Sequence, residues 1–210
     1  MRDIHLGIIG TGGFAREVLQ LAMDIHKKNS DFFCEINFIE LDEYFEQEFV
    51  DNIRVLKLSN CDLAKMKFVI AVANPMIKNR ILKQLPKKLK FTSIISQLAF
   101  IANDFKPKKG LIVMPFSYVS CNVKIGKHVH INSHCTIGHD TIIGDFSTTA
   151  CSVMISGNND IGNYCYFGMN SSTRQGLSIC DNVTIGLNAG VVKDITTAGT
   201  YIGTPSKILF

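Results

Sequence analysis

The sequence has no CxxC pair, no amino-terminal signal sequence and no apolar run that approaches the ~18 residues needed to span a bilayer. Its seven cysteines therefore predict reduced thiols rather than a disulfide framework, and the missing signal predicts a cytoplasmic protein without a membrane span. A basic run, KPKKG at 106–110, lacks the interleaved aromatic residues and the basic stripe of a nucleic-acid surface. We expect a solvated loop there and no nucleic acid partner.

The first 90 residues alternate between strand-like and helix-like patterns, within a composition (46% apolar, 19% charged) typical of a folded protein. The expected strands are IHLGIIG, EINFIE, IRVL and KFVIAVAN, and the expected helices are FAREVLQLAMDIHKK and the segment from Pro75 through MIKNRILKQL. This alternation predicts a small open parallel sheet with flanking helices, a Rossmann-like α/β domain over residues 1–96.

Beyond Asn103 the helical period disappears and an apolar residue returns at every sixth position. The fourteen positions, of which twelve carry Val, Ile or Phe, are Val113, Val119, Ile125, Ile131, Ile137, Ile143, Thr149, Ile155, Ile161, Phe167, Thr173, Ile179, Ile185 and Val191. A repeat this short cannot bury its own apolar face, so it must stack on itself as a parallel β-helix; a β-sandwich is the alternative. We expect three hexads per coil in a domain of residues 97–210, so that equivalent positions of successive coils are neighbours, and about four to five coils for the fourteen hexads that begin at Val113.

Small residues recur at fixed places in this repeat. Glycine follows the apolar residue in six hexads, where we expect a tight corner with unusual backbone angles, at Gly126, Gly138, Gly144, Gly162, Gly168 and Gly186. Cys135 and Cys165 fall on a small inward slot, which favours packing over nucleophilic catalysis.

Four segments, IIGTGGFAREVLQL, VANPMIKNRIL, IGHDTIIGDFS and YIGTPSK, are spread along nearly the whole chain. Their order and spacing resemble the bacterial acyltransferases that acetylate sialic acids or nucleotide-linked amino sugars for surface glycans, including the bacillosamine-type and perosamine-type N-acetyltransferases. The resemblance implies a left-handed β-helix, a homotrimer with active sites between neighbouring subunits, acetyl-CoA as donor, and an amino-terminal domain that holds a nucleotide sugar.

Gly10, Gly12 and Ala15 fit the pattern G-x-G-x-x-G/A between a strand and a helix, where backbone N–H groups can cradle a phosphate. An NAD site with Glu40 as ribose partner is one reading, but Glu40 follows Gly10 at a longer interval than that fingerprint has. Close packing of helix on sheet is another. The resemblance assigns the loop to the nucleotide sugar, although some relatives carry histidine at Phe14. The substrate-binding residues expected here are Gly10, Thr11, Gly12, Gly13 and Glu40.

The stretch HINSHCTIGHD at 130–140 raises the question of a metal site. His134 and His139 are spaced as in the β-helical carbonic anhydrases, but catalytic zinc needs three protein ligands and an open position. The third histidine of that family lies about two coils earlier, near Leu98, where this chain has none. His128 and His130 fall at other positions of the repeat, so we expect no metal.

His139 is the predicted general base, because an amine that attacks a thioester must lose a proton and histidine titrates near neutral pH. Asp140 follows it and can fix its tautomer, and the resemblance places the base at His139. Gly157 falls one coil later, where its N–H could stabilise the oxyanion. The resemblance also places Asn132 near the sugar. A solvent-facing corner histidine is the alternative for His139.

The donor site follows from the resemblance and from the later coils. At Thr148 some relatives carry a second histidine that touches acetyl-CoA. Gly157 and the tail residues Gly203, Pro205 and Lys207 complete the expected donor groove, with Lys207 opposite a phosphate.

These predictions combine into an acetyl-CoA-dependent N-acetyltransferase that acts on a UDP- or dTDP-linked amino sugar by direct attack, with His139 as base and without a covalent acetyl-enzyme. A sugar O-acetyltransferase of the sialic-acid type is one alternative. A non-catalytic β-helical nucleotide-binding or scaffold protein is the other.

Overall fold

The structure, a computed structural model, describes residues 4–28 and 33–209. Its amino-terminal part is a five-stranded sheet of order β3-β4-β2-β1-β5. The elements are β1 (His5–Ile9), α1 (Gly13–Lys28), β2 (Glu35–Glu40), η1 (Asp42–Tyr44), β3 (Phe49–Val50), β4 (Ile53–Lys57), η2 (Leu58–Asn60), β5 (Met66–Ile70) and α2 (Pro75–Gln84). The predicted strands and helices are confirmed.

The sequence explains these elements locally. α1 turns one apolar face to the sheet, where Val18, Leu19 and Ala22 are almost fully buried. α2 begins at Pro75 because the Asn74 side chain accepts hydrogen bonds from the first backbone N–H groups of the helix. β1 lies between β2 and β5 and is parallel to both, so the carboxyl ends of β1 and β5 flank the crevice where such sheets bind ligands.

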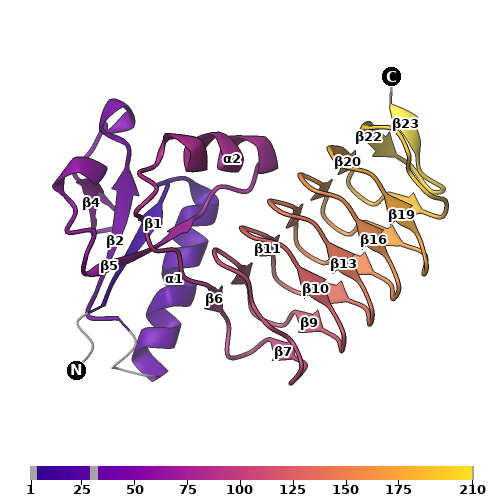
Figure 1. The fold of residues 1–210 in the computed structure, drawn as a ribbon, viewed down its shortest axis with the longest axis horizontal. Coiled ribbons are helices and arrows are strands. Elements are labelled where there is room, and N and C mark those ends of the chain that lie inside the picture. The colour runs from indigo at the N-terminus through magenta and orange to yellow at the C-terminus, as the bar shows by residue number, and fades with distance from the viewer. Residues whose placement is uncertain (1–3, 29–32, 210) are drawn as a thin grey trace.

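The rest of the chain winds into a parallel β-helix with three sheets (Figure 1). The first sheet contains β6 (Ile94–Ile95), β8 (Ile112–Val113), β11 (His130–Ile131), β14 (Thr148–Thr149), β17 (Tyr166–Phe167), β20 (Val183–Ile185), β22 (Gly199–Ile202) and the antiparallel β23 (Lys207–Leu209). The second contains β7 (Phe100–Ile101), β9 (Tyr118–Val119), β12 (Thr136–Ile137), β15 (Met154–Ile155), β18 (Ser172–Thr173) and β21 (Gly190–Val191). The third contains β10 (Lys124–Ile125), β13 (Ile142–Ile143), β16 (Asp160–Ile161) and β19 (Ser178–Ile179).

The register between coils is the predicted one of three hexads, as in the pairs Ile137↔Ile155 and Ile143↔Ile161. The fold class predicted from the sequence is therefore confirmed. The β-helix extends beyond the fourteen hexads on which the expected coil number was based, since the first sheet contains seven parallel strands from β6 to β22. The repeat continues back past Pro107, which interrupts its apolar series, and forward into a shortened coil in which Tyr201 pairs with Ile185.

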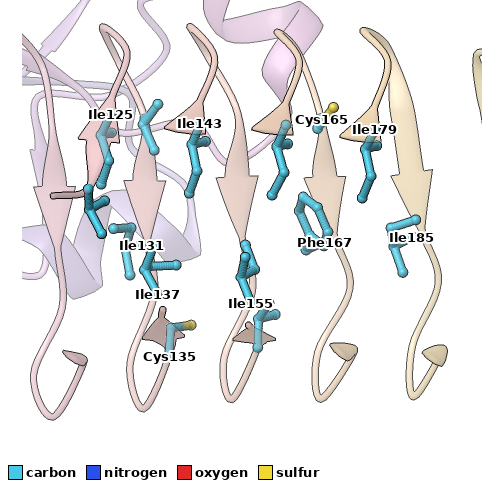
Figure 2. Packing of buried hydrophobic residues seen from close by; sticks show 14 of the residues in the cluster. Ile125, Ile131, Cys135, Ile137, Ile143, Ile155, Cys165, Phe167, Ile179 and Ile185 are labelled. Atoms are coloured by element: carbon cyan, nitrogen blue, oxygen red, sulfur yellow. The ribbon is translucent and has the colours of Figure 1, made fainter. Parts of the chain in front are cut away.

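Apolar side chains of successive coils point toward one another inside the β-helix, as the labelled isoleucines and Phe167 show (Figure 2). Cys135 and Cys165 belong to this core and are almost fully buried, which confirms their packing role. Each fully buried Ile or Phe contributes roughly 1.5–3 kcal/mol relative to an exposed side chain. Within the described residues, no helix is both long enough and apolar enough to cross a bilayer.

The glycines of the repeat have a different role from the one predicted. None of the six has a positive φ; the positive φ angles fall two residues later, at residues such as His128, Asp140 and Asn170. Glycine is needed because a Cβ at Gly138 or Gly144 would collide with the backbone of the next coil. Asn and Asp, which tolerate the left-handed conformation, occupy many of these corners, and His, Phe, Tyr or Ser occupy the others.

The α/β domain docks on the outward side of the first sheet. Ile94 and Ile112 join the apolar core of that domain, and the His130 ring lies 5.1 Å from that of Phe14. One coil later, Thr148 Oγ1 accepts a hydrogen bond of 2.9 Å from the fully buried Lys78 of α2. Burial holds the pKa of Lys78 well below its usual range. β6, which pairs with β8, ends just before the predicted domain boundary of 96/97.

His128 generates a pH-dependent stability prediction. Its buried ring lies between Phe91 and Phe146, and burial, followed by the nearby Lys78, lowers its pKa to about 4. In the unfolded chain His128 becomes protonated below about pH 6.5, whereas the folded form stays neutral until pH 4, so its stabilising contribution is lost as the pH falls through this window. The loss amounts to at most roughly 3 kcal/mol.

We expect the free energies of unfolding of the parent and His128→Phe to diverge between pH 6.5 and 4, with the parent losing more, in urea titrations at each pH. The phenyl ring keeps the stacking, so the variant differs mainly in its missing titration. Parallel curves across this window would contradict the assignment.

Candidate active site

His139 and Asp140 lie at the corner between β12 and β13, which we call the His139 corner. His139 Nδ1 and Asp140 Oδ2 are 2.7 Å apart, and both side chains are about half exposed. Because three sheets enclose the β-helix, this corner between the second and third sheets lies opposite the first sheet, on which the α/β domain docks. His139, the predicted base, and the loop that follows β1 are therefore on opposite sides of one chain.

Asn122, one coil earlier, holds the carboxylate of Asp140. Its Nδ2 donates to Asp140 Oδ1 at 3.1 Å, and its backbone N–H donates to Asp104. The hydrogen bond from His139 and then that from Asn122 lower the pKa of Asp140, which therefore accepts as a carboxylate. His139 Nδ1 consequently carries the proton and Nε2 presents a free lone pair. Sequence reasoning missed Asn122, although its place three hexads before Asp140 was a usable signal.

Gly157, one coil later, lies against the imidazole ring. A Cβ at this position would be 2.7 Å from both Cε1 and Nε2 of His139. In a different corner column the backbone N–H at this position is capped by a side chain of the next coil, as Asn163 caps Asp145 at 2.8 Å. In the column of His139, the described residues provide no such cap for Cys121, His139 or Gly157. Among the residues that the structure describes, nothing accepts a hydrogen bond from the Gly157 N–H. The structure thus brings together a free imidazole nitrogen and a free N–H.

The other histidines of the 130–140 stretch lie elsewhere. His134 lies at the preceding corner, where its ring is 5.1 Å from that of Phe116. His130 is fully buried beneath the α/β domain. The described ranges 4–28 and 33–209 contain no group of three or more His, Cys, Asp or Glu side chains placed to hold a metal ion.

The glycine loop lies at the carboxyl end of β1. Gly10 has a φ of 112°, which favours glycine, and Gly13 begins α1. Thr11 Oγ1 donates a hydrogen bond of 2.6 Å to Glu40 Oε1, while the buried Glu40 Oε2 has no hydrogen-bond partner in the described part of the chain. Thr11 and Glu40, both predicted to bind substrate, are thus brought together over the open N-terminus of α1.

The remaining predicted residues lie apart from His139. Asn132 lies at the corner between the first and second sheets, where its Oδ1 accepts from the Ser133 N–H at 2.8 Å. Gly203, Pro205 and Lys207 belong to the terminal hairpin β22–β23. In a single chain, neither group reaches the His139 corner.

Thr148 is not placed as predicted for a residue that touches the donor. Its side chain is almost fully buried and bonded to Lys78, so direct contact with acetyl-CoA is disfavoured. The next residue in its column, Tyr166, instead lines a cleft of about 410 Å³ between α2 and the first sheet, together with Asn74, Met76 and Tyr164. Sequence reasoning missed this cleft because it depends on how the two domains dock.

Two family profiles match the chain. The PglD N-terminal domain profile matches residues 5–85, and the bacterial transferase hexapeptide (six repeats) profile matches residues 116–151. The first covers the α/β domain, and the second covers the coils that carry His139 and Asp140.

Several known proteins are similar over most of the chain. GDP-perosamine N-acetyltransferase from Escherichia coli O157:H7 is 27% identical over 81% of this chain and 78% of its own length. Among solved structures, WeeI from Acinetobacter baumannii AYE is 26% identical with a TM-score of 0.86, over 98% of this chain and all of its own. The acetyltransferase domain of PglB from Neisseria gonorrhoeae FA1090, solved with acetyl coenzyme A, has a TM-score of 0.83 at 24% identity, over 99% of this chain and 100% of its own, and supports the fold.

The contact between Gly157 and His139 can be tested sterically. Gly157 does not have a positive φ, so Gly157→Ala strains no backbone angle, but its methyl group must displace the imidazole from its place beside Asp140. We expect a crystal structure of the variant to show His139 rotated away from Asp140, with a melting temperature within a few degrees of the parent. Gln175→Ala, one coil later in the same column, should leave the ring in place. An undisturbed His139 in Gly157→Ala would contradict the packing described.

Proposed function

We propose that this chain, whose α/β domain matches the PglD N-terminal domain profile and whose coils match the bacterial transferase hexapeptide profile, transfers an acetyl group from acetyl-CoA to the amine of a nucleotide-linked amino sugar. The observation that carries the proposal is the His139 corner, where an imidazole hydrogen-bonded to a carboxylate lies against Gly157, a residue whose backbone N–H has no partner among the described residues. This is the pair of groups that acyl transfer from a thioester requires.

In the proposed reaction, His139 Nε2 accepts a proton from the amine as its nitrogen attacks the thioester carbonyl carbon. Asp140 stabilises the imidazolium that forms, since it accepts from Nδ1 at 2.7 Å. The Gly157 N–H donates to the carbonyl oxygen as negative charge develops on it. His139 then returns the proton to the departing thiolate of CoA, so the products are an acetamide and free CoA.

We assign the nucleotide sugar to the loop of Gly10, Thr11, Gly12 and Gly13. A diphosphate there would meet the backbone N–H groups at the start of α1, and the space around Gly12 and Gly13 is open. Glu40, whose Oε1 accepts from Thr11, is assigned to a ribose hydroxyl. Asn132 is assigned to sugar positioning.

A homotrimer is part of the proposal because one chain cannot bring its own loop to its own base. The loop belongs to the domain on the first sheet, and His139 lies at the opposite corner. Exposed apolar side chains on the second sheet, next to the His139 corner, support contact with a second copy: Phe100, Tyr118 and Met154 are 43–57% exposed. A subunit seated there would bring its glycine loop toward His139.

We place the donor along the later coils, with its thioester at Gly157 and its long arm toward the 410 Å³ cleft of a neighbouring subunit. The hairpin residues Gly203, Pro205 and Lys207 would meet its phosphate end, where the exposed Lys207 supplies positive charge. Acetyl-CoA and its product are cytoplasmic metabolites, so we also propose a cytoplasmic location.

His139 is the residue to change first. We expect His139→Ala to lower kcat by about 10²–10⁴-fold with little change in the KM for acetyl-CoA, because the proton acceptor is lost while the donor groove remains. Asp140→Asn should cause a smaller loss, since the imidazole remains. His134→Ala serves as the matched control and should retain the parental rate. A His139→Ala variant that keeps most of the parental kcat would exclude the base assignment.

The acceptor is identified by CoA release measured with UDP-, dTDP- and GDP-linked 3-amino and 4-amino sugars, beside hydroxyl acceptors of the sialic-acid type. We expect turnover with an amino sugar, and we propose UDP or dTDP as the nucleotide, whereas the Escherichia coli relative is named for GDP-perosamine. Turnover with hydroxyl acceptors alone would establish the O-acetyltransferase instead.

Glu40 tests the acceptor site separately. Glu40→Gln keeps an acceptor for Thr11 but loses the charge, so we expect the KM for the nucleotide sugar to rise about tenfold with kcat unchanged. Glu17→Gln, on the exposed face of α1, is the control and should change neither constant. Equal kinetics for Glu40→Gln and the parent would remove Glu40 from the site.

A further inference from the structure

A groove of about 700 Å³ adjoins the His139 corner on the side of the earlier coils. Asp140 forms one end of it, and Lys106, Lys108 and Lys124 line it. This volume lies within the range of small-molecule sites. The sequence predicted only a solvated loop at 106–110, and the reaction described above uses none of these lysines.

Two of the lysines are separated by three hexads in the sequence. Lys106 and Lys124 both line the groove, although the third sheet begins with Lys124 and no strand pairing among the described residues joins the two. Like charges gathered along one groove repel one another. An anion between the ammonium groups would convert this repulsion into attraction.

The carboxylates of the groove already have partners within the protein. Asp104 accepts from the Asn122 backbone N–H, and Asp140 accepts from His139 and Asn122. Within the described residues, none of the three lysines forms an ion pair. The ammonium groups are therefore available to a ligand, and the floor beside them includes Ile142, which is 41% exposed. This combination suits a ligand with phosphate groups and a less polar body.

We propose that Lys106, Lys108 and Lys124 form a diphosphate subsite that holds a substrate while its reacting group lies at His139. The proposal rests on the proposed function, since both of its substrates carry a diphosphate. The nucleotide sugar is the favoured source, because the groove lies on the Asn122 side of the base and the thioester is assigned to the Gly157 side. The subunit that supplies the base would then also bind the acceptor held by its neighbour's glycine loop.

The test is calorimetric binding of UDP, dTDP, GDP, CoA and inorganic pyrophosphate to the full chain and to the triple variant Lys106→Gln, Lys108→Gln, Lys124→Gln. We expect affinity for the nucleoside diphosphate that the parent binds, and for pyrophosphate, to fall about fivefold or more, with a weaker dependence on salt and no change for CoA. The control is Lys65→Gln, Lys83→Gln, Lys87→Gln, which removes the same charge from the α/β domain, away from the groove.

A loss confined to CoA and pyrophosphate would keep the diphosphate subsite and assign it to the donor. Unchanged affinity for all five probes, or an equal loss in the control, would overturn it. Turnover is measured separately: a parent that binds these probes but acetylates no amino sugar would refute the proposed function and leave the binding result intact. Circular dichroism of the triple variant verifies that it folds.

Discussion

The backbone hydrogen bonds between successive coils are the constraint on which the rest of the structure depends. Each coil donates to the next at fixed positions, as in Gly138 N–H to Ile155 and Gly144 N–H to Ile161, both at 2.8 Å. Residues at equivalent positions of successive coils are thereby held side by side. Side chains from distant parts of the sequence form columns whose spacing is set by the backbone and not by loop conformation.

At the His139 corner, these backbone hydrogen bonds fix the residues that surround the imidazole ring. Asn122, the His139–Asp140 pair and Gly157 come from three successive coils, yet Asn122 bonds to Asp140 and Gly157 lies against the His139 ring. A site built on regular structure in this way is held more rigidly than one built on loops. The rigidity has a steric requirement: the imidazole fits only because the next residue in its column, Gly157, has no side chain.

The same periodicity decided what the sequence could predict. Periodic patterns that are visible in one sequence predicted the order of strands and helices in the α/β domain. They also predicted the register of three hexads and the inward position of the cysteines. The role of the glycines was predicted wrongly. Glycine is favoured both where a Cβ would clash with the next coil and where the backbone has a positive φ, and only the φ angles of the structure distinguish these two reasons. Thr148 and Lys78 could not be predicted together, because their contact joins distant parts of the chain across a domain interface that no repeat encodes.

That interface limits what one chain can do. Lys78 is fully buried with Thr148 as its hydrogen-bond partner, and burial holds its pKa well below the usual value, because an unpaired buried charge is costly. The α/β domain is thereby fixed to the first sheet, with its glycine loop directed away from the opposite corner. The position of the α/β domain and the position of His139 are both fixed by packing within one chain. In the proposed reaction, the nucleotide sugar on a glycine loop can therefore reach a His139 only when that histidine belongs to a second copy of the chain.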